Sequence, residues 1–212
     1  MRCLAGAQPD GLPFPFIPGY SLAGHVAARG ADVELAVGAP VFATGTITST
    51  PPRMWGGHVR HALCRAADVV PVPPGIGMRA ASIGHLAAIA YHGLRLAQPQ
   101  PHERVAVVGL GAIGQLAARL FTATGATVVA ADLTPPRVQR AQQGGVSAFA
   151  PAAGELVAGF RTHFPDGVDV IVDATGASQV LPQLIELAKD LPWDYWYCEL
   201  FQNRDVIEAT RN

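Results

Sequence analysis

The clearest hydrophobic pattern lies in residues 104–121, where the sequence RVAVVGLGAIGQLAARLF joins two different periodicities. The continuous apolar run at 105–108 predicts a strand buried on both faces. From Ala112 onward, apolar residues recur three and four positions apart, which predicts a helix with one buried face that ends at Gly125. A further apolar run at 128–131 leads into Asp132. The segment therefore predicts a strand, a glycine turn, a helix and a second strand.

Strands and helices continue to alternate after Asp132. The predicted helices cover residues 136–143, 155–164 and 178–189, and the predicted strands lie near 148 and at 168–173. Alternation of this kind is typical of a parallel sheet with right-handed crossovers, so the fold class is α/β with a doubly wound sheet. The aromatic segment 192–201 is compatible with a fifth strand or with a hydrophobic patch.

The first third of the chain has a different pattern, with short apolar bursts separated by glycine and proline. The bursts lie at 22–28, 39–44, 58–64 and 69–72. They predict short strands in a small barrel-like β region. An alanine-rich stretch at 80–97 predicts a connecting helix. The expected organisation is a β lobe at 1–78, a joining helix and linker at 79–102, and a nucleotide-type fold at 103–212.

Composition narrows the class of protein. The 212 residues are 50% hydrophobic and 15% charged, with a formal net charge of −1, which indicates a globular chain without the basic field that binds nucleic acid or membranes. No apolar stretch is long enough to span a bilayer. Three widely spaced cysteines fit neither a disulfide framework nor a closed zinc site, so we expect a reducing, cytoplasmic setting.

Each glycine of the turn has its own physical task in a dinucleotide-binding loop. Gly109 permits the sharp exit from the strand, Gly111 lets a pyrophosphate approach bare backbone, and Gly114 lets the helix pack closely. The unpaired amides and dipole at the helix start bind phosphate without a lysine. The candidate cofactor-binding residues of the loop are Gly109, Leu110, Gly111, Ala112, Ile113 and Gly114.

Asp132 is the residue that discriminates between cofactors. A carboxylate at this place accepts hydrogen bonds from both ribose hydroxyls of an adenosine and repels the extra phosphate of NADP, which favours NAD(H). The alternative is a doubly wound domain in which Asp132 only caps the turn before Pro135. Arg137, on the following helix, either flanks the adenine or is solvated.

Several stretches, in this order, resemble the medium-chain dehydrogenase/reductase superfamily, which includes alcohol and polyol dehydrogenases and quinone reductases. They are PGYSLAGHVAARG (18–30) with AVGAPVF (36–42), WGGHVRH (55–61) with VPVPPG (70–75), AASIGHLAAIAYHGL (80–94) and DATG (173–176). The resemblance implies a Rossmann-type domain, incomplete here, behind a partial GroES-like β-barrel lobe. It also implies that Ala174, Thr175 and Gly176 lie alongside the nicotinamide ribose of the cofactor.

The chain departs from this family at the catalytic zinc. Tyr20 and Ser21 stand where zinc members have histidine and glutamate, and the early cysteine is absent unless Cys3 serves. Only His85 lies where a ligand is expected. Because a catalytic zinc needs about three protein ligands, we predict no zinc.

The second departure is length, since whole family members carry strands before residue 1 and beyond the fourth strand of the nucleotide fold. The chain is then either a shortened relative or a piece of a longer one. An incomplete sheet leaves an open edge, which a homodimer or a partner chain would cover.

Without zinc, another group must exchange a proton with the substrate oxygen. The catalytic candidates are His85, favoured because histidine in general is the better acid–base group near neutral pH, and Tyr20. Packing is the alternative role for both. The leading hypothesis is a zinc-independent NAD(H)-linked oxidoreductase acting on a small carbonyl or alcohol. The alternatives are a nucleotide-binding module without turnover and a non-redox enzyme on the same fold.

Overall fold

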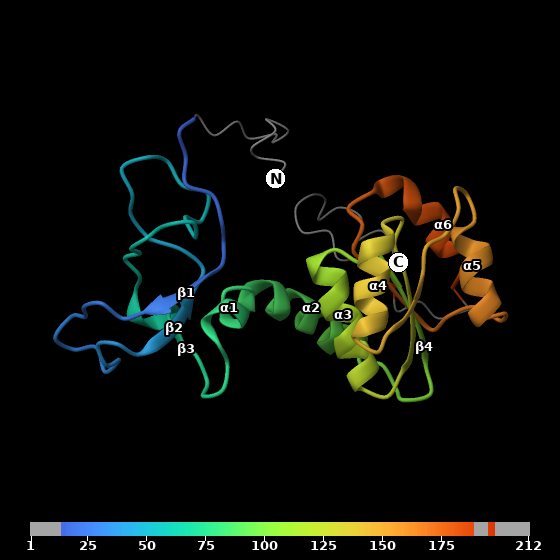
Figure 1. The fold of residues 1–212 in the computed structure, drawn as a ribbon, viewed down its shortest axis with the longest axis horizontal. Helices are drawn as coiled ribbons and strands as arrows, with labels where there is room; N and C mark the ends of the chain where they lie inside the picture. The colour runs from blue at the N-terminus through green and yellow to red at the C-terminus, as the bar shows by residue number, and fades with distance from the viewer. Residues whose placement is uncertain (1–13, 189–194, 198–212) are drawn as a thin grey trace, which may run out of the picture. The chain divides into compact units, whose positions relative to one another are not determined.

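The computed structural model describes residues 14–188 and 195–197. The chain divides into two compact units, Met1–Leu86 and Ala87–Asn212 (Figure 1). The boundary lies within helix α2 (Gly84–Ala97). The division into a β lobe, a joining segment and a nucleotide fold at 1–78, 79–102 and 103–212 remains a proposal.

The second unit is built on a five-stranded sheet in the order β6-β5-β4-β7-β8, and every neighbouring pair is parallel. The strands are β4 (Arg104–Val108), β5 (Thr127–Ala131), β6 (Ser147–Phe149), β7 (Val170–Asp173) and β8 (Tyr195–Tyr197). Val108 pairs with Ala131 on one side and with Asp173 on the other, so three strands end level with one another. The order of the chain reverses at β4, and ligands bind at such a switch point in open α/β sheets.

Helices cover both faces of this sheet. They are α3 (Ala112–Ala123), α4 (Pro135–Gln143), α5 (Leu156–His163) and α6 (Leu181–Ile185), with a short 3-10 helix η2 (Ser178–Val180). In Figure 1, α3 and α4 lie on one side of β4 and α5 and α6 on the other.

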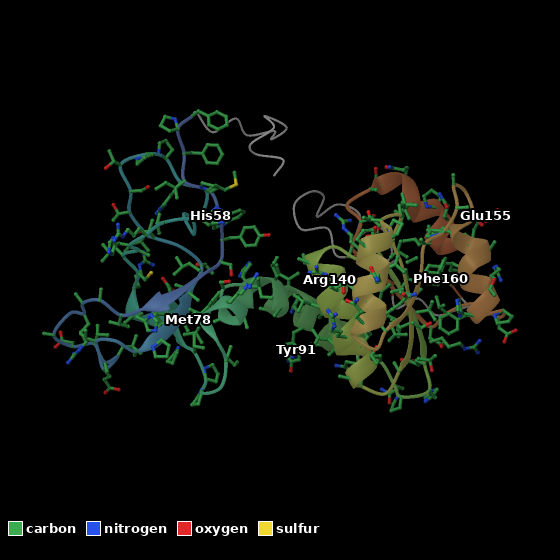
Figure 2. All side chains as sticks on the ribbon, in the orientation of Figure 1. His58, Met78, Tyr91, Arg140, Glu155 and Phe160 are labelled. Carbon is green, nitrogen blue, oxygen red and sulfur yellow. The ribbon has the colours of Figure 1, made fainter. Side chains whose placement is uncertain are left out.

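Alternate residues of β4 point into two separate cores. Val105 and Val107 pack with Phe121 of α3, whereas Ala106 and Val108 pack with Phe160 of α5, which is labelled in Figure 2. Because both faces are covered, the strand reads as a continuous apolar run rather than an alternating one. The predicted Rossmann-type doubly wound sheet is confirmed.

Two predicted helices are interrupted in the structure. The helix expected at 80–97 is divided into α1 (Met78–Ala81) and α2. At the break, the amide of Ile83 donates to the Ala80 carbonyl only three residues back, and the Ser82 carbonyl accepts the hydroxyl of Ser21. The helix expected at 178–189 becomes η2 and the short α6, since Pro182 lacks the N–H that would continue the first turn. The aromatic segment contributes β8, so at 195–197 it is a fifth strand.

The first unit contains a three-stranded antiparallel sheet in the order β1-β2-β3. Its strands are β1 (Leu22–His25), β2 (Pro40–Ala43) and β3 (Val70–Pro71), and a 3-10 turn, η1 (Ala66–Asp68), precedes β3. The barrel-like lobe remains a prediction, because the described residues show only this sheet.

The strand predicted at 58–64 is wrong. The amide of His58 donates to the Pro18 carbonyl, whereas the amide of Leu63 donates to the side-chain oxygen of Thr46. Without a single neighbouring strand to pair with, the apolar burst stays irregular.

No helix in the described part of the chain is long and apolar enough to cross a membrane.

Candidate dinucleotide-binding site

The turn between β4 and α3 is packed so closely that two of its glycines have no room for a side chain. A Cβ on Gly109, whose φ is +88°, would lie 2.8 Å from the backbone of Ala174 and Thr175. A Cβ on Gly114 would lie 1.7 Å from the carbonyl oxygen of Gly109. These glycines therefore serve the fold, because they let the first turn of α3 and the end of β7 approach the loop.

Gly111 differs from the other two, because a Cβ built on it meets nothing within 4 Å. Its φ is −65°, a value that any residue adopts, so neither packing nor strain requires glycine here. Gly111 is the residue before α3, and the first amides of a helix have no partner within the helix. Bare backbone beside unpaired amides is the arrangement that accepts a pyrophosphate.

The remaining loop candidates contribute backbone rather than side chains. Leu110 is 1% exposed, and Ile113 packs against the core formed by α3 and β4. Ala112 is exposed at the first position of α3. All three lie within the turn that the sequence predicted.

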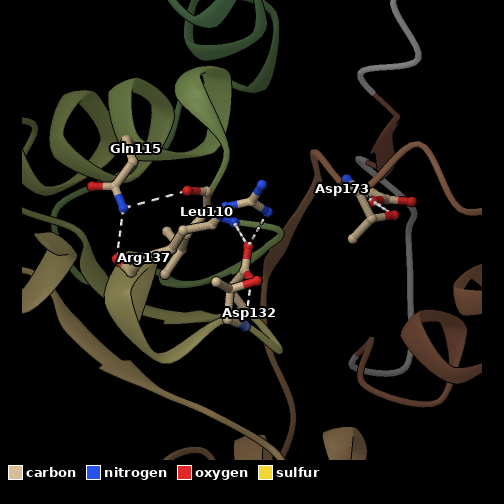
Figure 3. Close-up of polar contacts among 7 residues, drawn as sticks. Leu110, Gln115, Asp132, Arg137 and Asp173 are labelled. Atoms are coloured by element: carbon tan, nitrogen blue, oxygen red, sulfur yellow. Dashed lines mark hydrogen bonds and ion pairs between the residues drawn. The ribbon is translucent and has the colours of Figure 1, made fainter. Parts of the chain in front are cut away.

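The carboxylate of Asp132 faces this loop (Figure 3). Its Oδ2 accepts the amide N–H of Leu110 at 2.6 Å, and its Oδ1 accepts the amide N–H of Thr134 at 2.7 Å. The guanidinium of Arg137 lies 3.3 Å from Oδ2. Burial raises the pKa of Asp132, but the hydrogen bonds from Leu110, Thr134 and Arg137 lower it by more. The residue, 8% exposed, is therefore a charged carboxylate at neutral pH.

Both interpretations of Asp132 from the sequence have a counterpart in this geometry. The bond from the Thr134 amide is the one expected if Asp132 only caps the turn before Pro135. The bond from the Leu110 amide connects the carboxylate to the glycine loop. A carboxylate has about four acceptor positions, and the three contacts leave little free capacity. A ribose diol would have to compete with Arg137, whose side chain is 54% exposed and therefore free to move away.

The sequence analysis missed Leu133. It directly follows Asp132 and is 77% exposed, the largest exposure among the big hydrophobic side chains of the described residues. A leucine exposed to water directly beside the Asp132 carboxylate offers an apolar surface to a ligand. The signal was available in the sequence, since an apolar residue directly after the acidic one has no place in the buried strand that ends there.

The turn at 174–176 is held by Asp173. Asp173 is 1% exposed, and its Oδ1 accepts the amide of Thr175 at 2.8 Å and the hydroxyl of Thr175 at 2.7 Å. The Thr175 hydroxyl oxygen in turn accepts the amide of Ala177. Among the described residues, the second oxygen of Asp173 has no hydrogen-bond partner. Asp173 thus fixes the turn that packs against Gly109, and the three predicted residues Ala174, Thr175 and Gly176 lie in it.

This arrangement predicts the stability of two variants. Asp173→Ala leaves the amide and hydroxyl of Thr175 without their acceptor and is expected to lower the free energy of unfolding by about 1–3 kcal/mol. Asp173→Asn keeps one acceptor oxygen for the amide and hydroxyl of Thr175, so it should lose less stability than the alanine variant. Urea denaturation followed by circular dichroism measures both. Equal losses in the two variants would contradict the assignment.

The two catalytic candidates lie together in the first unit. The rings of Tyr20 and His85 have centroids 5.2 Å apart at 63°, and the ring of Tyr20 also meets Trp55 at 5.6 Å in an edge-to-face contact. Trp55 is 46% exposed and has a φ of +60°, a rare value for a bulky residue. Ser21 is engaged elsewhere, since its hydroxyl donates to the Ser82 carbonyl. The structure thus brings Tyr20 and His85 into contact, and their catalytic roles remain a proposal.

His85 is the residue at which the sequence placed a family zinc ligand. Nowhere in the described ranges do three or more His, Cys, Asp or Glu side chains lie close enough to hold a metal ion. Burial, together with the negative charge of Asp68, raises the pKa of the Cys64 thiol, and its sulfur lies 3.5 Å from the Gly45 carbonyl oxygen. Cys3, the other ligand considered, lies outside the described residues.

The sheet order, the glycine turn and the carboxylate after the second strand define a dinucleotide-binding fold of the Rossmann type. A family profile described as "Zinc-binding dehydrogenase" matches residues 112–190. The chain belongs to the medium-chain dehydrogenase/reductase superfamily.

Individual relatives agree with this placement. The chain is 32% identical over 136 residues to L-galactonate-5-dehydrogenase of Escherichia coli K12, a match that covers 63% of this chain and 40% of that protein. It superposes on an alcohol dehydrogenase superfamily protein from Novosphingobium aromaticivorans with a TM-score of 0.78 at 26% identity, covering 97% of this chain and 62% of the other.

A third relative was solved with a cofactor. It is a short chain alcohol dehydrogenase from Escherichia coli CFT073 complexed with NADH, which gives a TM-score of 0.74 at 20% identity and covers 88% of this chain and 61% of that one. At this identity the likeness is one of fold. The chain spans less than two thirds of the length of each of the three relatives.

Proposed function

We propose that the protein is a zinc-independent NAD(H)-linked oxidoreductase that transfers hydride to or from a small carbonyl or alcohol substrate. The observation that carries the proposal is the open backbone at Gly111, which lies in the same loop as the amide that binds the charged carboxylate of Asp132. Curated relatives of the chain are named dehydrogenases, which supports an oxidoreductase role.

The cofactor would be held along the carboxyl ends of the central strands. Gly111 and the first amides of α3 would bind the pyrophosphate. Asp132 would accept hydrogen bonds from the adenosine ribose once Arg137 moves aside, and Leu133 would contact the adenine. The turn at 174–176 would lie alongside the nicotinamide ribose. Because a charged Asp132 repels a 2′-phosphate, the proposal specifies NAD(H) rather than NADP(H).

When bound, NAD(H) supplies or accepts the hydride, and the chain must move the accompanying proton. We assign this proton to His85, because an imidazole titrates near neutral pH, with Tyr20 as its neighbour. The ring contact between the two orients the imidazole. No step of this proposal uses zinc.

We further propose that the protein acts in the cytoplasm and that a second copy or a partner chain covers an open edge of the sheet. The described sheet ends at β6 on one side and at β8 on the other, and an unpaired edge strand is a template for association.

The proposal is tested by titrating the protein with NADH and following energy transfer from tryptophan to the nicotinamide. We expect a saturable signal with NADH and a much weaker one with NADPH. Stereospecific deuterium transfer from labelled NADH to a panel of aldehydes, ketones and enones then tests turnover. Absence of saturable NADH binding would contradict the proposal outright.

The second candidate function is a nucleotide-binding module without turnover. It is favoured by the ring contact between Tyr20 and His85, because a packing role for the two side chains accounts for this contact without any catalysis. Binding of NADH without deuterium transfer to any member of the panel would select it over the oxidoreductase.

A further inference from the structure

Gln115 has a buried side-chain amide that joins two parts of the cofactor site. It is the fourth residue of α3 and is 8% exposed. Its Nε2 donates to the carbonyl of Arg137 at 2.7 Å and to the carbonyl of Leu110 at 3.4 Å (Figure 3). In the part of the chain that the structure describes, its Oε1 has no hydrogen-bond partner.

The orientation of this amide is decided by the two carbonyls. Turning the amide over would place Oε1 against two acceptor oxygens and would leave both carbonyls without a donor. The Nε2 atom of Gln115 therefore donates to both carbonyls, and as a consequence its Oε1 atom faces no donor among the described residues. Burying an unsatisfied polar atom carries a free-energy cost, so packing alone does not account for a glutamine here.

The contacts of Gln115 close a ring with those of Asp132. The amide of Leu110 and the guanidinium of Arg137 both donate to Asp132 Oδ2, while the carbonyls of the same two residues accept from Gln115. The ring links the glycine loop, the end of β5 and the start of α4. Both the N–H and the C=O of Leu110 are held, which fixes the direction in which the loop presents its amide to Asp132.

We propose that Gln115 is a positioning residue that orients the Leu110 peptide and the first turn of α4 so that Asp132 faces the adenosine ribose. This inference rests on the proposed function for its ligand. Gln115 itself does not touch the cofactor in this proposal, and it acts through Leu110, Asp132 and Arg137. Its loss should weaken NADH binding and also reduce the preference for NADH over NADPH.

A matched control exists on the same helix. Arg119 also ties α3 to α4, since its guanidinium donates to the carbonyls of Gln115 and Arg140. Among the described residues, its hydrogen bonds involve neither Leu110 nor Asp132. Arg119→Met therefore removes an α3–α4 connection of similar kind without disturbing the ring, and it separates positioning from general loosening of the two helices.

The test compares Gln115→Met and Arg119→Met with the wild type, in two measurements. In the cofactor-free protein, hydrogen exchange at the Leu110 amide should accelerate about tenfold in Gln115→Met and stay within about twofold in Arg119→Met. In NADH and NADPH titrations, Gln115→Met should raise the Kd for NADH about tenfold and the Kd for NADPH by less.

A second variant covers the case in which Gln115→Met does not fold. Gln115→Glu keeps the length of the side chain but donates a hydrogen bond only when protonated. Its NADH affinity should improve as the pH falls from 8 to 5, whereas that of the wild type should change little, because Asp132 stays charged over this range.

The outcomes separate the two proposals. Unchanged exchange at Leu110, or equal losses in Gln115→Met and Arg119→Met, would overturn the positioning role whatever the cofactor. Faster exchange at Leu110 in Gln115→Met, together with a wild-type protein that does not bind NADH, would overturn the proposed function and the cofactor part of this inference.

Discussion

Replacing Asp132 by alanine is expected to weaken NADH binding about 100-fold, because two hydrogen bonds from the ribose to a charged group are lost at about 1.5 kcal/mol or more each. The same change should narrow the difference between NADH and NADPH, since the charge that repels a 2′-phosphate is gone. Fluorescence titration with the two cofactors measures both effects.

Two variants accompany this measurement. Asp132→Asn retains an acceptor oxygen without the charge, so it should lose discrimination against NADPH and keep more NADH affinity than the alanine variant. Asp166→Asn is the control, because that carboxylate is exposed and paired only with Arg104 at 3.4 Å in the described contacts. Equal NADH affinity in Asp132→Ala and the wild type would show that Asp132 is only a turn cap.

Alanine at Gly111 is expected to weaken NADH binding and leave stability nearly unchanged, whereas alanine at Gly114 is expected to destabilise the fold. The new methyl group at Gly111 meets open space, so the free energy of unfolding should change by less than about 1 kcal/mol. It would nevertheless occupy the approach of the pyrophosphate, and we expect NADH affinity to fall by at least about 30-fold.

Gly114→Ala instead drives a methyl group into the carbonyl of Gly109, at 1.7 Å before relaxation, and should destabilise the fold by about 3 kcal/mol or more. Thermal unfolding and NADH titration of both variants form the measurement. Gly93→Ala serves as the control, since its Cβ also meets nothing within 4 Å but lies on α2. Full NADH affinity in Gly111→Ala would place the pyrophosphate elsewhere.

Most of the second unit was predictable from local pattern. The strand at 104–108 and the helix that follows it were expected from a change of period, because burial on two faces or on one face leaves its own spacing in the sequence. Gly125, with φ +90°, lies just beyond α3, where a left-handed residue commonly ends a helix.

The predictions that were wrong concern elements whose formation depends on residues distant in the sequence. The apolar burst at 58–64 has the composition of a strand, but a strand requires a neighbour, and its amides are bonded to scattered acceptors instead. At the break near Ser82, the carbonyl of Ser82 accepts the hydroxyl of Ser21, 61 positions away, and helix periodicity does not register such a contact.

The candidate site shows the same division. The residue types, three glycines and an acidic side chain, followed from the sequence, since each is chemically suited to a dinucleotide. The sequence did not show which glycines serve packing and which one leaves room for a ligand, because Gly109 is crowded by residues 174 and 175, in the turn after β7. The role of Gln115 was also invisible, since its partner Arg137 is 22 positions away.

By itself, the sequence determined the alternating strands and helices of the second unit and the chemistry of its glycine turn, because period and residue type record local burial and local backbone freedom. Only the tertiary structure decided that Asp132 is turned toward Leu110, that Asp173 holds the neighbouring turn, and that Gln115 closes the ring. These contacts join segments brought level by the pairing of β4 with β5 and β7, and strand register is a property of the assembled sheet.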